Sequence, residues 1–159
     1  MHYSIIITCE HAGNTVPEKY KSLFNDLEDV LNSHEGWDPG AWEVATYLGN
    51  HFQIVPIGCH TTRLLIEANR ALDSSQLFSR YSILLSDEEK KNLIDEIYNP
   101  YRQLVKLKIE QLQQPVLHLS IHSFTPIYYG TKRNVELGLL FDPDRRLESH
   151  FCQEFQDAL

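Results

Sequence analysis

The sequence predicts an α/β fold with a mixed, largely parallel sheet and helices on both faces. Short apolar runs rich in β-branched residues alternate with segments of helical periodicity along 159 residues. The run SIIIT at residues 4–8 is apolar on both faces, as is typical of a strand between two helical layers. The length favours a single domain over residues 1–159. The last helical pattern, at residues 145–159, ends without a capping signal, so we expect a C-terminal portion to be missing.

Five apolar runs are short enough to be strands. They cover residues 3–9, 53–57, 63–66, 115–121 and 135–141. In the fourth run, period-two alternation places Leu117, Leu119 and Ile121 on one face and His118, Ser120 and His122 on the other. The first face is predicted to be core and the second to be polar.

Helical patterns occupy the segments between these strands. In DPGAWEVATYLGNHF, residues 38–52, Asp38 is placed to cap a helix whose apolar face packs on the sheet. A second helix is predicted to begin at SDEE, where Ser86 and Glu89 have the spacing of a capping box. Pro100 costs about 3 kcal/mol in a helix interior, so we expect a kink or a fresh start there.

The composition excludes several classes of partner. The chain has 14 Lys and Arg against 22 Asp and Glu, and a net charge of −8, which repels nucleic-acid phosphates and anionic lipid. No segment reads as a signal peptide or a membrane span, so we expect a cytoplasmic protein that binds no nucleic acid and no membrane. Cys9, Cys59 and Cys152 are too few and too widely spaced for a disulfide framework, which indicates reduced thiols.

Two histidines stand in the run HLSIHSFTP, residues 118–126. At the carboxyl end of a strand in an α/β sheet, His122 is placed to present a ring nitrogen to a cleft. His118 lies further back and is the better candidate for a supporting role. From this run alone, two histidines that are simply hydrogen-bonded within the fold remain an alternative.

A second polar segment, TCEHAGNTVP at residues 8–17, follows the first strand. Catalytic zinc commonly has three protein ligands drawn from neutral imidazole and carboxylate, and leaves one position open. Glu10, His11 and His122 form such a set. A thiolate nucleophile at Cys9 beside His11 is the rival interpretation, although a cysteine at this place is more often a small buried apolar residue.

A third segment, TTRLLIEANRALD at residues 61–73, carries Arg63, Asn69 and Arg70. The planar fork of arginine is suited to bidentate binding of a carboxylate, so these residues are candidates for an anion clamp. The alternative is that the arginines form surface ion pairs with nearby acidic residues such as Glu67.

Two further segments carry candidates. HEGWDPGA places His34 and Asp38 ahead of a helix. Both residues are candidates for a metal ligand or a base, and the alternative for Asp38 is that it only caps the helix. Arg133, in GTKRN before the last predicted strand, is one more candidate for the anion pocket.

Together these segments resemble the N-formylglutamate amidohydrolase family. The resemblance rests on TCEHAGNTVP, HEGWDPGA, TTRLLIEANR and SIHSFTP, in that order along the chain. A more distant similarity, in LSIHSFTP and IEANR, is to zinc carboxypeptidases and their deacylase relatives. The resemblance implies a three-layer, phosphorylase/hydrolase-like fold of the zinc-carboxypeptidase kind. It also implies zinc-dependent hydrolysis of an N-acyl amino acid carrying carboxylates, with N-formyl-L-glutamate yielding formate and L-glutamate.

The same resemblance implies roles for individual residues. His11 and His122 correspond to zinc histidines, Asn14 stands where the distant relatives have a ligand glutamate, and Glu10 is the expected substitute. The expected catalytic residues are Glu10, Arg63 and Asp38, with Glu10 or Asp38 as general base. The expected substrate-binding residues are Asn69, Arg70, Arg133 and Asn14. The expected metal ligands are His11, His122, Glu10 and His34.

Two other functions remain open from the sequence. One is a peptidase or deacylase that acts on another N-acyl or peptide bond. The other is a binding module that keeps the fold and the arginine pocket without a competent metal. The sequence leaves the oligomeric state open.

Overall fold

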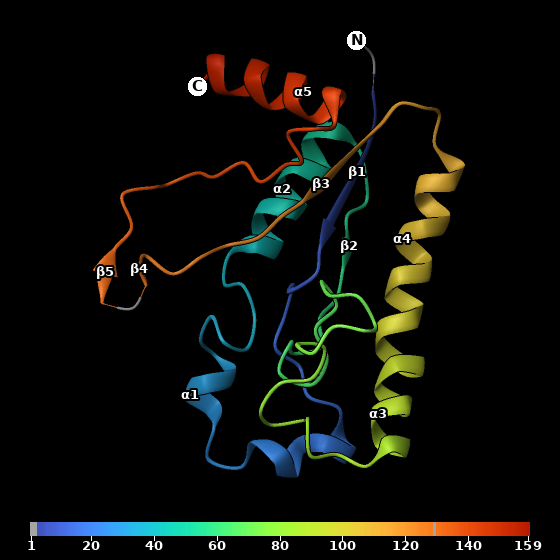
Figure 1. The fold of residues 1–159 in the computed structure, drawn as a ribbon, viewed down its shortest axis with the longest axis vertical. Helices are drawn as coiled ribbons and strands as arrows, with labels where there is room; N and C mark the ends of the chain where they lie inside the picture. Colours follow the sequence, from blue (N-terminus) through green and yellow to red (C-terminus); the bar gives the residue numbers. More distant parts are fainter. Residues whose placement is uncertain (1–2, 129) are drawn as a thin grey trace. The chain divides into compact units, whose positions relative to one another are not determined.

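A computed structural model describes residues 3–128 and 130–159 (Figure 1). The chain groups into two compact units, Met1–Phe124 and Thr125–Leu159, which we describe separately. The single domain over residues 1–159 therefore stays a prediction. No described helix is both long enough and apolar enough to cross a membrane.

The first unit contains a parallel sheet of strands β1 (Ser4–Cys9), β2 (Ile57–Gly58) and β3 (Val116–Ser120). Strand β1 is central and pairs in parallel with both neighbours, in the order β2-β1-β3. The α/β class with a parallel sheet is therefore confirmed, and the strands predicted at residues 3–9 and 115–121 are present. The three-layer arrangement of the zinc-carboxypeptidase kind stays a prediction.

Side chains of β1 alternate between two apolar clusters. Ile7 packs with Ala45 of α2 (Ala41–Phe52), whereas Ile6 packs with Val105 of α4 (Asn99–Gln111). Helices α2 and α4 accordingly contact different sides of the strand, and Figure 1 shows them flanking it. The side chains of β1 that lie on the same face as Ile6 therefore point toward α4.

The helix predicted at SDEE forms with the predicted cap. Ser86 accepts a hydrogen bond from the backbone of Glu89, and the Glu89 side chain accepts one from the backbone of Ser86, at the start of α3 (Asp87–Leu93). A π-helical segment, η2 (Ile94–Tyr98), follows α3 and leads into α4. Pro100 then lies in the first turn of α4, where its missing N–H costs least. The expected kink or fresh start is met by the π-helical turn before it, and the backbone stays helical from α3 into α4.

The prediction that Asp38 caps helix α2 is wrong. The residue before α2 is Gly40, whose φ of 83° is left-handed, and no side chain caps the helix. Asp38 is 3 % exposed and its carboxylate faces other side chains instead. A sequence pattern shows that Asp38 is close to a helix start but does not show which way the carboxylate turns.

Two of the predicted strands are absent and one is shortened. Residues 63–66 form turns, and their apolar side chains join a core cluster with Tyr20 and Phe24 from the η1 segment (Glu18–Phe24). Residues 53–57 contribute only the start of β2, and residues 135–141 have no strand. A short apolar run does not by itself distinguish a strand from a buried loop.

The remaining elements are short, apart from the last helix. In the first unit, α1 covers Glu28–Leu31. In the second unit, β4 (Ile127–Tyr128) and β5 (Thr131–Lys132) form an antiparallel pair. The helix predicted at residues 145–159 is present as α5 (Arg146–Asp157).

Candidate functional site

The carboxyl ends of the central strands carry the predicted polar residues. Glu10 and His11 follow β1 directly, and His122 comes two residues after the end of β3. Thr8 lies opposite Ser120 in the parallel register, so the two strands end at the same edge. Residues more than a hundred positions apart in sequence are thereby brought together, at the edge where α/β folds place their sites.

His11 is buried between two carboxylates. Its Nδ1 lies 3.2 Å from Oδ2 of Asp38, and its Nε2 is hydrogen-bonded to Oε1 of Glu67. The backbone N–H of Asp38 also donates to the carbonyl of His11, at 3.1 Å, which holds the two segments together. Burial lowers the pKa of His11, but the hydrogen bonds to the two carboxylates outweigh it and raise that pKa above its usual value.

His122 faces the same Asp38 oxygen. Its Nδ1 lies 2.8 Å from Oδ2 of Asp38, and its Nε2 lies 3.3 Å from Oε2 of Glu10. The rings of His11 and His122 have their centroids 4.9 Å apart. Burial lowers the pKa of His122, but hydrogen bonds to Asp38 and Glu10 outweigh this effect and raise the pKa to about 9.

Glu10 is surrounded by hydroxyl groups. Its Oε1 accepts from Thr8 Oγ1 at 2.9 Å and from Tyr101 Oη at 2.6 Å, and its Oε2 accepts from Ser120 Oγ at 2.5 Å. Burial alone raises the pKa of Glu10, but these bonds and the one to His122 hold it well below its usual range. A carboxylate stabilised in this way is a weak proton acceptor.

Glu67 is a site residue that the sequence interpretation treated only as an ion-pair partner. It is 7 % exposed, contacts His11, and accepts from Arg63 Nε at 2.9 Å. Arg63 Nη1 also donates to Oδ1 of Asp38, at 3.3 Å. Burial raises the pKa of Glu67, but its hydrogen bond with His11, the charges of His11 and Arg63, and the Asn69 backbone N–H lower it to about 2. The signal available in the sequence was an acidic residue directly after the buried run LLI.

Three side chains are placed to hold a metal ion. His11, Asp38 and His122 each offer one ligand atom, and these atoms lie within 4.8 Å of one another. Two imidazoles and one carboxylate are a donor set typical of catalytic zinc, which leaves a position for water or substrate. Of the predicted ligands, His11 and His122 are in this group, and Asp38 supplies the third atom.

The other two predicted ligands lie beside the group. Glu10 contacts Nε2 of His122, on the side of the ring away from Asp38. His34 has its Nε2 3.3 Å from Oγ of Ser123, whose backbone N–H donates to Asp38 at 3.3 Å. His34 is thus one residue removed from the cluster, and its ring contacts a neutral hydroxyl.

The predicted substrate-binding residues divide into two groups. Nδ2 of Asn69 lies 3.4 Å from Nε2 of His122, which places Asn69 beside the cluster. The neighbouring Arg70 is exposed, and its guanidinium has no hydrogen bond or ion pair within the described part of the chain. Arg133 belongs to the second unit, so its role stays a prediction.

Known proteins resemble this chain over almost its whole length. The family described as N-formylglutamate amidohydrolase matches residues 3–159. The chain belongs to the N-formylglutamate amidohydrolase family. Among solved structures, a gene product of Agrobacterium tumefaciens is similar with a TM-score of 0.83 and 31% identity. That alignment covers 95% of this chain and 64% of the other, so the chain spans less than two thirds of that relative. No curated protein matches.

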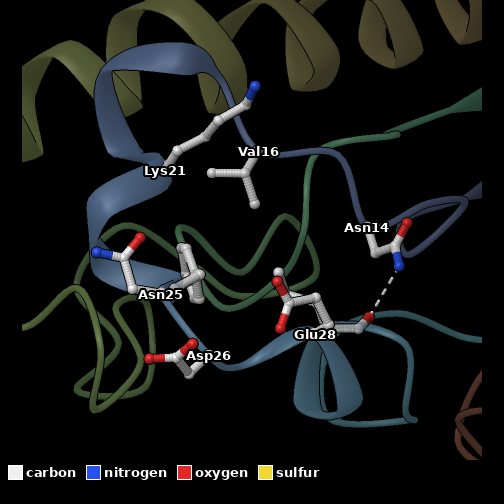
Figure 2. A pocket seen from close by; sticks show the side chains of 8 residues that line it. Asn14, Val16, Lys21, Asn25, Asp26 and Glu28 are labelled. Atoms are coloured by element: carbon white, nitrogen blue, oxygen red, sulfur yellow. Dashed lines mark hydrogen bonds between the residues drawn. The ribbon is translucent and has the colours of Figure 1, made fainter.

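Within this N-formylglutamate amidohydrolase family member, Asn14 takes part in a different contact. Its Nδ2 donates to the carbonyl of Leu31 at 3.0 Å and to Oδ1 of Asn32 at 2.9 Å. Figure 2 shows the first of these bonds at the edge of a cavity of about 590 Å³. No residue lining this cavity belongs to the histidine and carboxylate cluster. The structure therefore does not bring Asn14 to the cluster, and its substrate-binding role stays a prediction.

The rival thiol chemistry is disfavoured by the surroundings of Cys9. The side chain is fully buried and packs in the cluster of Ile7 and Ala45. Burial, together with the nearby carboxylates, raises the pKa of Cys9 to about 12, although a hydrogen bond from the His11 backbone lowers it in part. A thiol with such a pKa is a poor nucleophile at neutral pH.

Proposed function

We propose that this protein is a metal-dependent amidohydrolase of N-acyl amino acids, with N-formyl-L-glutamate as the favoured substrate. Water cleaves the amide bond, which yields formate and L-glutamate. The observation that carries the proposal is the cluster of His11, Asp38 and His122 at the strand ends of a chain in this family. We also propose that the sheet belongs to a three-layer fold of the zinc-carboxypeptidase kind.

His11, Asp38 and His122 would hold the metal, and zinc suits this donor set. When bound there, zinc supplies Lewis acidity toward the amide carbonyl and a lowered pKa for the attacking water. Around it, Glu67 fixes the ring of His11, and Arg63 joins Glu67 to Asp38. Arg63 is thus committed to two carboxylates, and a role in holding the cluster together suits it better than a role in the substrate clamp.

The proton from water needs an acceptor in this chain. Glu10 and Asp38 were the predicted bases, but both have pKa values well below the usual range, because hydrogen bonds with histidines outweigh the effect of burial. His34 is the remaining residue that the sequence predicted as a ligand or a base. Its ring contacts the neutral hydroxyl of Ser123 and not a carboxylate of the cluster. Histidine is the commonest general base at neutral pH, so we assign proton transfer to His34.

Arg70 and Asn69 are the proposed contacts for the substrate's carboxylates. Arg70→Ala is expected to raise KM for N-formyl-L-glutamate about 10- to 100-fold, because a hydrogen bond to a charged group contributes about 1.5–3 kcal/mol. The change in kcat is expected to be small, since Arg70 is outside the metal cluster. Steady-state kinetics measure both values. Arg80→Ala, which removes an exposed arginine paired with Glu35, is the control. An unchanged KM in Arg70→Ala contradicts the clamp.

The function itself is tested with the full-length protein. We expect it to release formate from N-formyl-L-glutamate, to lose this activity on treatment with a chelator, and to recover it with zinc. A panel of formyl, acetyl and succinyl amino acids then ranks the acyl groups. Faster cleavage of another acyl group identifies the protein as a different deacylase. Absence of both metal and activity identifies a binding module.

A further inference from the structure

The hydroxyl groups around Glu10 all have to donate their hydrogens to its carboxylate. An ionised glutamate only accepts hydrogen bonds, so each hydroxyl in contact with it donates its single proton. Thr8, Tyr101 and Ser120 all make this contact, at 2.9, 2.6 and 2.5 Å. Glu10 is 4 % exposed, so these side chains take the place of water around it.

This direction determines what Ser120 offers to His122. The proton of Ser120 is donated to Glu10, so Oγ of Ser120 has only lone pairs for its second contact, with Nε2 of His122 at 3.0 Å. The other close oxygen, Oε2 of Glu10 at 3.3 Å, is also an acceptor. Nε2 of His122 therefore has to carry a hydrogen, and a neutral His122 has its lone pair on Nδ1.

The same rule applies on the other side of Glu10. Thr8 donates to Oε1 of Glu10, so its oxygen accepts from Nε2 of His118, 2.8 Å away. The two histidines of β3 and its extension thus both place an Nε2 proton against a hydroxyl that donates to one carboxylate. Thr8 and Ser120 each donate to Glu10 and accept from a histidine Nε2. Glu10 therefore sets the direction of both hydrogen-bond chains.

Resting on the proposed function, we propose that Glu10 is a positioning residue that sets the tautomer of His122 through Ser120. In this structure Nδ1 donates to Oδ2 of Asp38, 2.8 Å away, and with Nε2 kept protonated, Nδ1 is the nitrogen that would give up its hydrogen to bind the metal. Glu10 is then neither a metal ligand nor the general base. Tyr101, from helix α4, holds Glu10 in place and so links this helix to the site.

The proposal also sets the orientation of Asn69. Its Nδ2 stands 3.4 Å from Nε2 of His122, and two donors do not bond to each other. The oxygen and nitrogen of an amide are assigned from such networks, and a half-turn about the last torsion exchanges them. With a hydrogen on Nε2, Asn69 turns its oxygen toward His122 and its NH₂ group becomes free for a substrate carboxylate.

The first measurement is the tautomer of His122 in the full-length protein loaded with zinc. Long-range ¹H–¹⁵N spectra of histidine-labelled protein distinguish the two ring nitrogens. We expect a hydrogen on Nε2 and the metal on Nδ1. A hydrogen on Nδ1, with the metal on Nε2, overturns the proposal and points to Glu10 as a direct ligand.

The second measurement is zinc affinity, by competition with a chelator. Glu10→Gln is expected to weaken binding about 10- to 100-fold, the usual range for the partner of a metal-binding histidine. Ser120→Ala should weaken it less, and Ser120→Thr, which keeps the hydroxyl, should retain the wild-type affinity. Tyr20→Phe removes a buried tyrosine hydroxyl elsewhere, one bonded to the Glu89 carbonyl at 3.3 Å, and should change nothing.

The outcomes separate this proposal from the proposed function. If the wild type binds zinc and Ser120→Ala binds it equally well, Glu10 does not act through Ser120, and metal-dependent hydrolysis is unaffected. If the wild type binds no zinc, metal dependence and the role of Glu10 both fail. If Glu10→Gln does not fold, the comparison of Ser120→Ala with Ser120→Thr still decides.

Discussion

His122→Ala is expected to abolish zinc binding and turnover together. The substitution removes one of the three ligand atoms of the cluster and leaves His11 and Asp38 without it. Even a residue that only orients a ligand is worth about 10- to 100-fold in affinity, so the loss of a ligand should exceed about 100-fold. Bound zinc after gel filtration and the rate of formate release measure the two effects.

A matched control for this variant is His51→Ala. His51 lies on helix α2 and contacts the ring of Phe52, with centroids 5.0 Å apart. It should keep wild-type zinc and activity. Full zinc and full activity in His122→Ala would refute the assignment of the site, provided that thermal unfolding shows both variants to be folded.

His34→Gln should reduce kcat about 100- to 10,000-fold, the range expected for loss of a general base. Zinc affinity should stay at the wild-type value, because His34 contacts Ser123 and is outside the cluster of ligand atoms. Rates at saturating substrate and a chelator competition give the two numbers. A lower kcat with unchanged zinc affinity identifies a base, whereas a lower zinc affinity identifies a ligand.

His60→Gln is the control for this second variant. His60 packs edge-on against Trp42, with ring centroids 4.8 Å apart, and is not one of the three residues that could hold the metal. Its kcat is expected to be unchanged. Loss of zinc in His34→Gln would make His34 a ligand, which is the other role that the sequence predicted for it. Unchanged kcat would leave proton transfer to another group.

Much of the fold could be predicted from local sequence patterns. The capping box at Ser86 and Glu89 and the alternation along β3 are properties of a few adjacent residues, and the structure has both. The strand-end position of His11 and His122 followed from the general rule for α/β sheets. The runs at residues 63–66 and 135–141 failed as strands, because hydrophobicity records burial better than it records hydrogen-bond pairing.

The candidate site could be predicted only in part from the sequence. The sequence by itself determined the histidines, the acidic residues and their order along the chain, together with the family. Only the tertiary structure turned Asp38 from an expected helix cap into the residue between His11 and His122, and brought Glu67 to His11 across 56 positions. The physical reason is that side-chain direction at a loop depends on partners supplied by distant segments. The parallel register of β1 and β3, which aligns Thr8 with Ser120, decides which partners those are.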